Sequence, residues 1–141
     1  MERYEYLDHT GDLGLRAYGE TPAALFTNAA MGLLETVADL DTIKAVVQIE
    51  IEVSADSVEN MLVAWLGELI FRHEVDEVLF RQVEIQEISE SPSTLSAVVH
   101  GEPMGLAKHV VYTEIKSVTY HQLFVEQNPD GSWIAQVIFD L

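Results

Sequence analysis

Two hydrophobic periodicities, in a fixed order along the chain, most constrain how this sequence folds. Two segments, at about 21–38 and 57–73, carry apolar residues three and four positions apart, which is the spacing of one helix face. The other structured segments alternate apolar and polar residues, as strands with one buried face do. Strands and helices do not alternate regularly, which argues against a doubly wound parallel sheet. The pattern predicts a single α+β domain over residues 1–141, with mainly antiparallel sheets packed against two amphipathic helices.

Local signals set the expected limits of these segments. Thr21 followed by Pro22 is typical of a helix start. Asp56 and Glu59 form a capping-box signature before the second helix, which we expect to end near His73 and Glu74. The expected strands cover residues 3–8, 13–19, 45–54, 78–88, 94–100, 117–126 and 132–139. Between Gly101 and Thr113 we expect a loop that leads into a short helical turn.

The charge of the chain limits its partners. Its 24 acidic residues outnumber seven Lys and Arg, which gives a formal net charge of −17. Tight binding to a nucleic-acid backbone needs clustered basic residues, and the sequence has none. We therefore expect no direct tight binding to nucleic acid and no attraction to anionic membranes, whereas cations and basic protein surfaces suit this charge. The same charge could also serve solubility alone.

Cysteine content and hydropathy exclude further classes. The absence of Cys excludes disulfides, thiolate metal sites and Cys nucleophiles. The residues after Met1 do not resemble a signal peptide, and no apolar run is long enough to span a bilayer. We expect a cytoplasmic protein.

The first candidate site is the turn-like stretch from Asp8 to Asp12. It places two acids, His9 and Thr10 around a bend that contains Gly11. Ca²⁺, Mg²⁺ and Mn²⁺ prefer oxygen ligands, so the stretch is compatible with a hard divalent cation. The alternative is that the Asp and Thr side chains only cap a turn.

The second candidate site is the end of the sequence. A strand with a buried face runs up to Asp140 and Leu141, so we expect the terminal carboxylate to be held beside the Asp140 side chain. Two anionic groups so close repel each other, and a bound cation or a Lys or Arg partner would relieve the repulsion. The alternative is that both groups face water.

The third candidate is the segment from Glu114 to His121. In strand alternation Thr119 and His121 share one face, and Val118 and Tyr120 share the other. Lys116 is expected to form a salt bridge with Glu114 or another acid, and His121 to be a partly buried strand residue. The spacing supports no Ser-His-Asp arrangement, and the five His residues are too scattered to predict a metal site built from several of them.

Several motifs, in order along the whole chain, resemble those of the archease family. They are DHTGDLGL (8–15) with AYG (17–19), ALFTNAA (24–30), WLGELI (65–70), GEP (101–103) with KH (108–109), EIKSVTYH (114–121) and VIFDL (137–141). Two positions differ from the usual family pattern, because Gly11 and Ser117 each replace an Ala. Each motif is weak by itself, and the ordered set is specific.

This resemblance implies an accessory protein and not a free-standing enzyme, with no catalytic residues of its own. Archeases activate the GTP- and manganese-dependent RNA ligase of tRNA splicing, by promoting guanylylation of the ligase and its multiple turnover. The family metal site falls on Asp12, Asp140 and Leu141, with Ca, Mg or Mn as the divalent cation. Asp8, His9, Lys116 and His121 are further functional candidates by position.

Two other functions compete with this interpretation. One is a general chaperone or modulator of RNA-processing enzymes, such as a tRNA methyltransferase, in which any metal is incidental. The other is a small metal-dependent hydrolase that uses the same acids, although no nucleophile or base stands out in the sequence.

Overall fold

The computed structural model describes residues 2–9, 11–105 and 108–141, and for His9 the backbone alone. Thr10, which belongs to the first candidate site, lies outside the described residues. The strands are β1 (Tyr4–His9), β2 (Asp12–Gly19), β3 (Val47–Ala55), β4 (Val78–Glu90), β5 (Ser93–Pro103), β6 (Ser117–Gln127) and β7 (Trp133–Asp140). The helices are α1 (Pro22–Val37), α2 (Val58–Asp76) and a short 3₁₀ turn, Leu40–Thr42.

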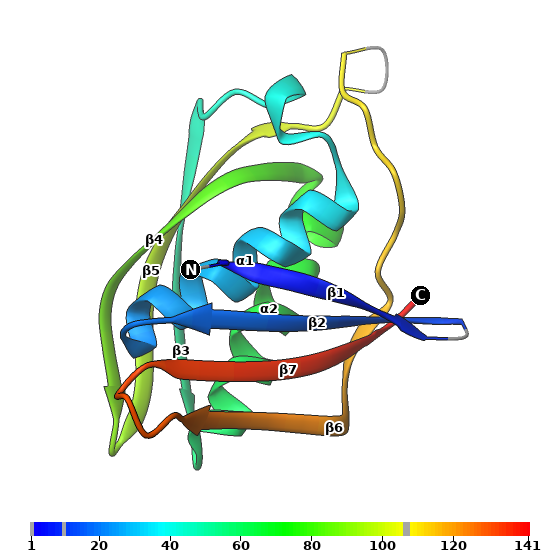
Figure 1. Cartoon of the computed structure of the whole chain (residues 1–141). Coiled ribbons are helices and arrows are strands. Elements are labelled where there is room, and N and C mark those ends of the chain that lie inside the picture. The colour runs from blue at the N-terminus through cyan, green and yellow to red at the C-terminus, as the bar shows by residue number, and fades with distance from the viewer. Residues whose placement is uncertain (1, 10, 106–107) are drawn as a thin grey trace.

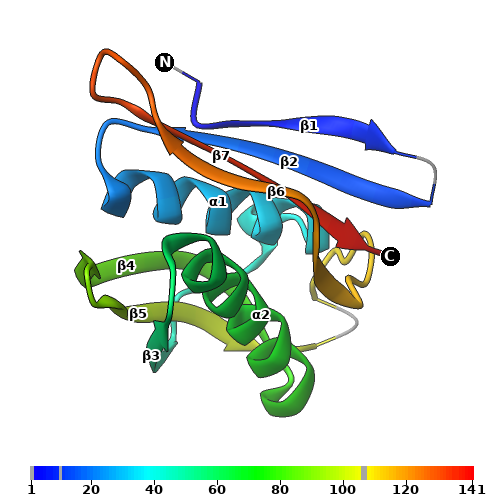
Figure 2. The ribbon, with the colours of Figure 1, turned by 90° about the horizontal axis from the view of Figure 1, so that it is seen from below.

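The strands form two antiparallel sheets. One has four strands in the order β1-β2-β7-β6, and the other has three in the order β3-β5-β4. Both helices lie between the sheets, with α1 against β2 and β4 and α2 against β6 and the three-stranded sheet (Figure 2). The predicted α+β class, with antiparallel sheets and two amphipathic helices, is confirmed. Neither α1 nor α2, in the described part of the chain, is long and apolar enough to cross a membrane.

One core cluster joins both sheets and both helices. Trp65 of α2 is fully buried, and its indole Nε1–H donates to the Phe26 carbonyl of α1 at 3.0 Å. Leu15 and Phe139 face the helices from the four-stranded sheet, and Val99 faces them from the other sheet. This hydrogen bond satisfies the one polar group of the buried indole, so the Trp65 side chain leaves no unpaired donor between the helices.

The ends of the elements differ from the sequence predictions in small ways. Ser57, not Asp56, caps α2, because its hydroxyl accepts from the Asn60 backbone N–H at 3.1 Å. The helix continues to Asp76, beyond the predicted end, and stops where Glu77 adopts a left-handed conformation (φ 53°). β5 extends to Pro103, and in the following loop the N–H groups of Lys108 and His109 donate to the Gly105 carbonyl.

The four-stranded sheet brings the two ends of the sequence together. β1 and β7 end, and β2 and β6 begin, at the same end of this sheet. The row of strand ends there is called the edge below. Figure 1 shows the end of β1 and the start of β2 near the C-terminus. This edge therefore collects residues from the opening motif, the long motif and the closing motif.

Candidate metal centre

Two aspartates lie directly opposite each other at this edge. Asp12, the first residue of β2, is the register partner of Asp140, the last residue of β7. The same row continues to the backbone of His9 in β1 and to Ser117 in β6. The fold thus places the two Asp residues that the family resemblance marks as metal ligands on adjacent strands, 128 positions apart in the sequence but paired in space.

The side chains of this pair project from the outer face of the sheet. Leu13 and Phe139 are the strand neighbours of Asp12 and Asp140, and both pack into the core. Since successive side chains alternate between faces, Asp12 and Asp140 point to the other side. Directly opposed residues of antiparallel strands have Cβ atoms about 5 Å apart, so two like charges meet at close range.

Hydrogen bonds fix the backbone around Asp140. The Lys116 N–H donates to the Asp140 carbonyl at 2.9 Å, and the Thr119 hydroxyl donates to the Ile138 carbonyl at 2.8 Å. β2 holds the other side of β7 through the pairs that lead up to Asp12. β7 ends at Asp140, one residue beyond the predicted end of the strand, and Leu141 follows directly.

Asp8 lies on the opposite face of the sheet from Asp12. Its register partner is Leu13, whose side chain packs against the core, so the Asp8 side chain shares that inner side at the exposed end of β1. The bend between the strands therefore does not direct both acids to one point. The structure brings Asp12 to Asp140 and keeps Asp8 apart from them.

The surroundings of Lys116 and His121 differ from those of the aspartate pair. Lys116 lines a groove with Phe71 and Glu74 of α2, and its ammonium forms no ion pair within the described residues, contrary to the predicted salt bridge. His121 is exposed, contrary to the predicted partial burial, because it lies where β6 slips out of register between Thr119 and Phe124. Its N–H donates to the Thr119 hydroxyl at 3.3 Å.

The slip in β6 breaks the predicted alternation. Val118 packs against the core, whereas Tyr120, predicted to share its face, is 65% exposed. Gln122 takes a left-handed conformation with φ 53°, and the amide of Gln136 donates to its carbonyl at 3.1 Å. A polar side chain of β7 therefore stabilises the irregular segment, which sequence periodicity does not reveal.

The donor set at the edge suits a hard cation better than zinc. Within the described residues no group of three or more His, Asp or Glu side chains is placed to hold a metal. Asp12 and Asp140 instead form a pair of carboxylates, which leaves further positions for main-chain oxygens and water. Ca²⁺, Mg²⁺ and Mn²⁺ accept such mixed oxygen ligands, whereas structural zinc sites use four His or Cys ligands.

A second polar cluster, not singled out from the sequence as functional, surrounds Glu102. This carboxylate is 7% exposed and accepts hydrogen bonds from Lys108 Nζ, from His109 Nε2 at 2.8 Å and from the Lys44 backbone N–H at 3.1 Å. These hydrogen bonds, that of Lys108 first, lower the pKa of Glu102 to about 2. The Gly105 N–H donates to His109 Nδ1 at 2.9 Å, so Nε2 carries the proton that it donates to Glu102.

This cluster ties the loop that follows β5 to the three-stranded sheet. Glu102 belongs to β5, whereas Lys108 and His109 belong to the loop. The sequence carried a signal for it, since Lys108 and His109 follow Glu102 by six and seven residues in a chain with few basic residues. The cluster holds the start of the segment that delivers Lys116 to Asp140.

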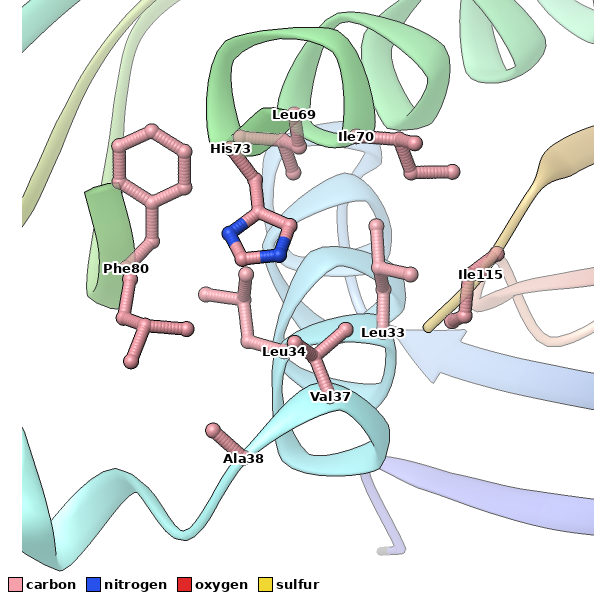
Figure 3. A pocket seen from close by; sticks show the side chains of 10 residues that line it. Leu33, Leu34, Val37, Ala38, Leu69, Ile70, His73, Phe80 and Ile115 are labelled. Carbon is pink, nitrogen blue, oxygen red and sulfur yellow. The ribbon is translucent and has the colours of Figure 1, made fainter. Parts of the chain in front are cut away.

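An apolar cavity under this loop is not a candidate substrate site. Figure 3 shows the His73 ring among aliphatic and aromatic side chains from both helices, β4 and the loop. His73 Nδ1 lies 2.9 Å from the Val78 carbonyl and donates to it. The cavity volume, about 20 Å³, is room for about one water molecule. It is too small for an organic substrate.

Comparisons with known proteins agree on one family. The model of the Archease protein family matches residues 4–141. The chain is similar to archease of Methanosarcina mazei, with 38% identity over 99% of this chain and 97% of the relative. It is also similar to the archeases of Methanopyrus kandleri (36%; 98% and 99% of the two chains) and Pyrococcus furiosus (32%; 100% of both).

A solved structure supports the same assignment. The solution structure of Methanobacterium thermoautotrophicum protein 1598 covers the whole of both chains, with a TM-score of 0.81 and 29% sequence identity. The agreement in sequence and in fold extends over both sheets and both helices. This chain therefore belongs to the archease family.

Proposed function

We propose that this protein is a metal-binding activator of the GTP-dependent RNA ligase of tRNA splicing, and that Asp12, Asp140 and the Leu141 carboxylate hold its divalent cation. Membership of the archease family supports the activator role. The observation that carries the metal-site proposal is the direct pairing of Asp12 with Asp140 across β2 and β7.

The pairing of two carboxylates is the physical reason to place a cation there. Like charges directly opposed in a sheet destabilise it, and the chain has a net charge of −17 that adds to the repulsion. Within the described residues, neither carboxylate forms an ion pair with Lys, Arg or His. A divalent cation between them neutralises both charges, and the loss of their repulsion adds to the free energy of cation binding.

The fold preorganises these ligands. The Lys116 N–H fixes the backbone of Asp140 from one side, and the ladder with β2 fixes it from the other. A bound divalent cation would supply positive charge of the kind that neutralises triphosphate oxygens in nucleotidyl transfer. The residues of this chain hold and orient that charge at an exposed edge, where a partner active site can approach it.

The acidic surface determines the kind of partner. With 24 acidic residues against seven Lys and Arg, the protein is repelled by RNA and attracted to basic protein surfaces. Activation therefore operates through contact with the ligase and not through capture of the RNA substrate.

Guanylylation of the ligase tests this proposal. Purified ligase is incubated with GTP and Mn²⁺, and covalent guanylate on the ligase is measured with wild-type protein, Asp12→Asn or Asp140→Asn. We expect wild type to accelerate guanylylation and both variants to lose that effect. Equal acceleration by Asp140→Asn would overturn the metal role. Suppression of ligase aggregation without metal dependence would support the chaperone interpretation instead.

A further inference from the structure

A groove follows the exposed side of α2 and passes the start of β6, whose first residue, Ser117, pairs with Asp140. It consists of two adjoining depressions that share Glu74. One lies between Glu77 and the loop residues 111–114, and the other between Phe71 and residues 116–118. We call the two depressions together the α2 groove.

Large apolar side chains border this groove and are exposed. Phe71 of α2 is 52% exposed, and Tyr112 of the loop is 62% exposed. Val111, next to Tyr112, is also exposed. Single exposed apolar residues are ordinary, but a group of them along one depression is typical of a protein interface, where Tyr and other aromatic residues contribute most binding energy.

The charges along the groove select a basic partner. Glu74, Glu77 and Glu114 line it, and none of these carboxylates forms an ion pair within the described residues. Lys116 is the single Lys or Arg among the described residues of the lining. Apolar anchors between unpaired carboxylates complement a partner surface that carries apolar side chains flanked by Lys or Arg.

The loop side of the groove is fixed in place. The Tyr112 N–H donates to the Val37 carbonyl of α1 at 2.8 Å, and Ile115 is buried in the core. Upstream, Glu102 holds Lys108 and His109. A preorganised loop loses little conformational entropy when a partner binds.

The groove and the metal centre share one residue. Lys116 lines the groove, and its backbone N–H donates to the Asp140 carbonyl at 2.9 Å. Ser117, the next residue, is the register partner of Asp140. A segment bound along α2 therefore passes the strand ends that carry the paired aspartates, whose side chains project from the other face of the sheet.

We propose that the α2 groove is the docking surface for the ligase, which would present a basic surface segment with exposed apolar side chains. This inference rests on the proposed function. Apolar side chains of the segment contact Phe71, Val111 and Tyr112, and its Lys or Arg residues pair with Glu74, Glu77 and Glu114. Docking there would bring Asp12 and Asp140 to the ligase while the opposite sheet stays free.

A charge-matched pair of double variants tests the docking surface. Glu74→Lys with Glu114→Lys reverses two charges in the groove. Glu52→Lys with Glu87→Lys makes the same change on the outer face of the three-stranded sheet, where both residues flank Ser96. The affinity of each for the cognate ligase is measured by calorimetry in the presence of Mn²⁺. We expect the groove variant to raise Kd about tenfold or more above the control, a change typical of loss at an interface centre.

Further variants separate docking from metal function. Tyr112→Ser removes an aromatic anchor without a change of charge and should also raise Kd, whereas Asp140→Asn should bind the ligase but fail to activate it. Thermal unfolding checks that each variant is folded. If wild type binds and activates while the groove variants bind as well as the control, the docking inference is wrong and the proposed function stands. If wild type neither binds nor activates the ligase, both are wrong.

Discussion

Asp12 and Asp140 are direct register partners in adjacent antiparallel strands, and both side chains project from the outer face of the four-stranded sheet. The pair joins the beginning of the chain to its end. Two carboxylates in this arrangement repel each other unless something positive lies between them. The proposed metal centre and its role in activation depend on this pair.

Removal of one carboxylate should change stability in opposite directions with and without metal. Without a divalent cation, Asp140→Asn should stabilise the fold by up to about 1 kcal/mol, because it removes a like-charge pair. With Mn²⁺ or Ca²⁺ at about 100 times Kd, wild type should gain about 2.7 kcal/mol. That gain corresponds to a rise in Tm of several degrees, which the variant should lack.

Thermal unfolding with and without each cation measures this difference, and Asp8→Asn is the matched control. Asp8 belongs to the same motif but lies on the other face of the sheet, so its variant should keep the full response to the cation. A response lost equally in Asp8→Asn and Asp140→Asn would show that the cation is held by diffuse negative charge and not by the pair.

A tag at the C-terminus should impair function more than one at the N-terminus. Residues appended after Leu141 convert the proposed carboxylate ligand into a peptide group next to Asp140. Residues appended before Met1 leave all three proposed ligands unchanged. We expect the C-terminal tag to weaken the cation-induced rise in Tm and the activation of the ligase. Equal performance of both tagged proteins would exclude the terminal carboxylate as a ligand.

Glu102 should make the fold sensitive to acid. Hydrogen bonds from Lys108, His109 and Lys44 lower its pKa from 4.5 to about 2, so the unfolded state binds a proton more readily than the folded state. The stabilisation is complete above about pH 4.5 and is lost as the pH falls towards 2. Urea unfolding at pH 3 and pH 6 should show a smaller change for Glu102→Gln than for wild type.

The exposed Glu52 of β3 provides the control for this measurement. Glu52→Gln removes a carboxylate of the same type without removing a buried cluster, and its stability should depend on pH as that of wild type does. An equal effect of both substitutions would assign the acid sensitivity to overall charge and not to the Glu102 cluster.

Two glycines should respond oppositely to alanine. A Cβ at Gly101 would lie 2.1 Å from the Leu79 carbonyl oxygen, so β4 and β5 would have to separate. Gly101→Ala should cost about 1–3 kcal/mol or more. A Cβ at Gly67, inside α2, meets no atom within 4 Å, so Gly67→Ala should stabilise the protein by roughly 1 kcal/mol. Denaturant unfolding measures both, and destabilisation by Gly67→Ala would contradict this account of α2.

The sequence predicts the elements well because each carries a local signal. The apolar stripes of α1 and α2 and the alternation in β3 reflect burial, which is the dominant favourable term in folding. The errors lie where a few hydrogen bonds decide, as at Ser57, which caps α2 in place of Asp56. The slip in β6 depends on a contact between Gln122 and Gln136, residues 14 positions apart.

For the candidate site, too, the sequence predicts one part, and the other part depends on contacts between distant segments. Composition and turn chemistry direct attention to Asp12 and Asp140, but only the strand order β1-β2-β7-β6 makes them neighbours. The same order separates Asp8 from Asp12 by the sheet face, which no spacing rule in the sequence reveals. Lys116 was expected to pair with an acid, and it instead lines the α2 groove together with Glu74 and Phe71 of α2, a contact between distant segments that local spacing does not show.

The most direct test of the central claim is a multiple-turnover RNA ligation assay with limiting cognate ligase, GTP and Mn²⁺. The number of RNA ends joined per ligase is measured without this protein, with wild type, and with Asp140→Asn. The account predicts many turnovers with wild type and about one with the variant or without the protein. Many turnovers with Asp140→Asn would contradict the role of the paired aspartates, and no gain with wild type would contradict activation itself.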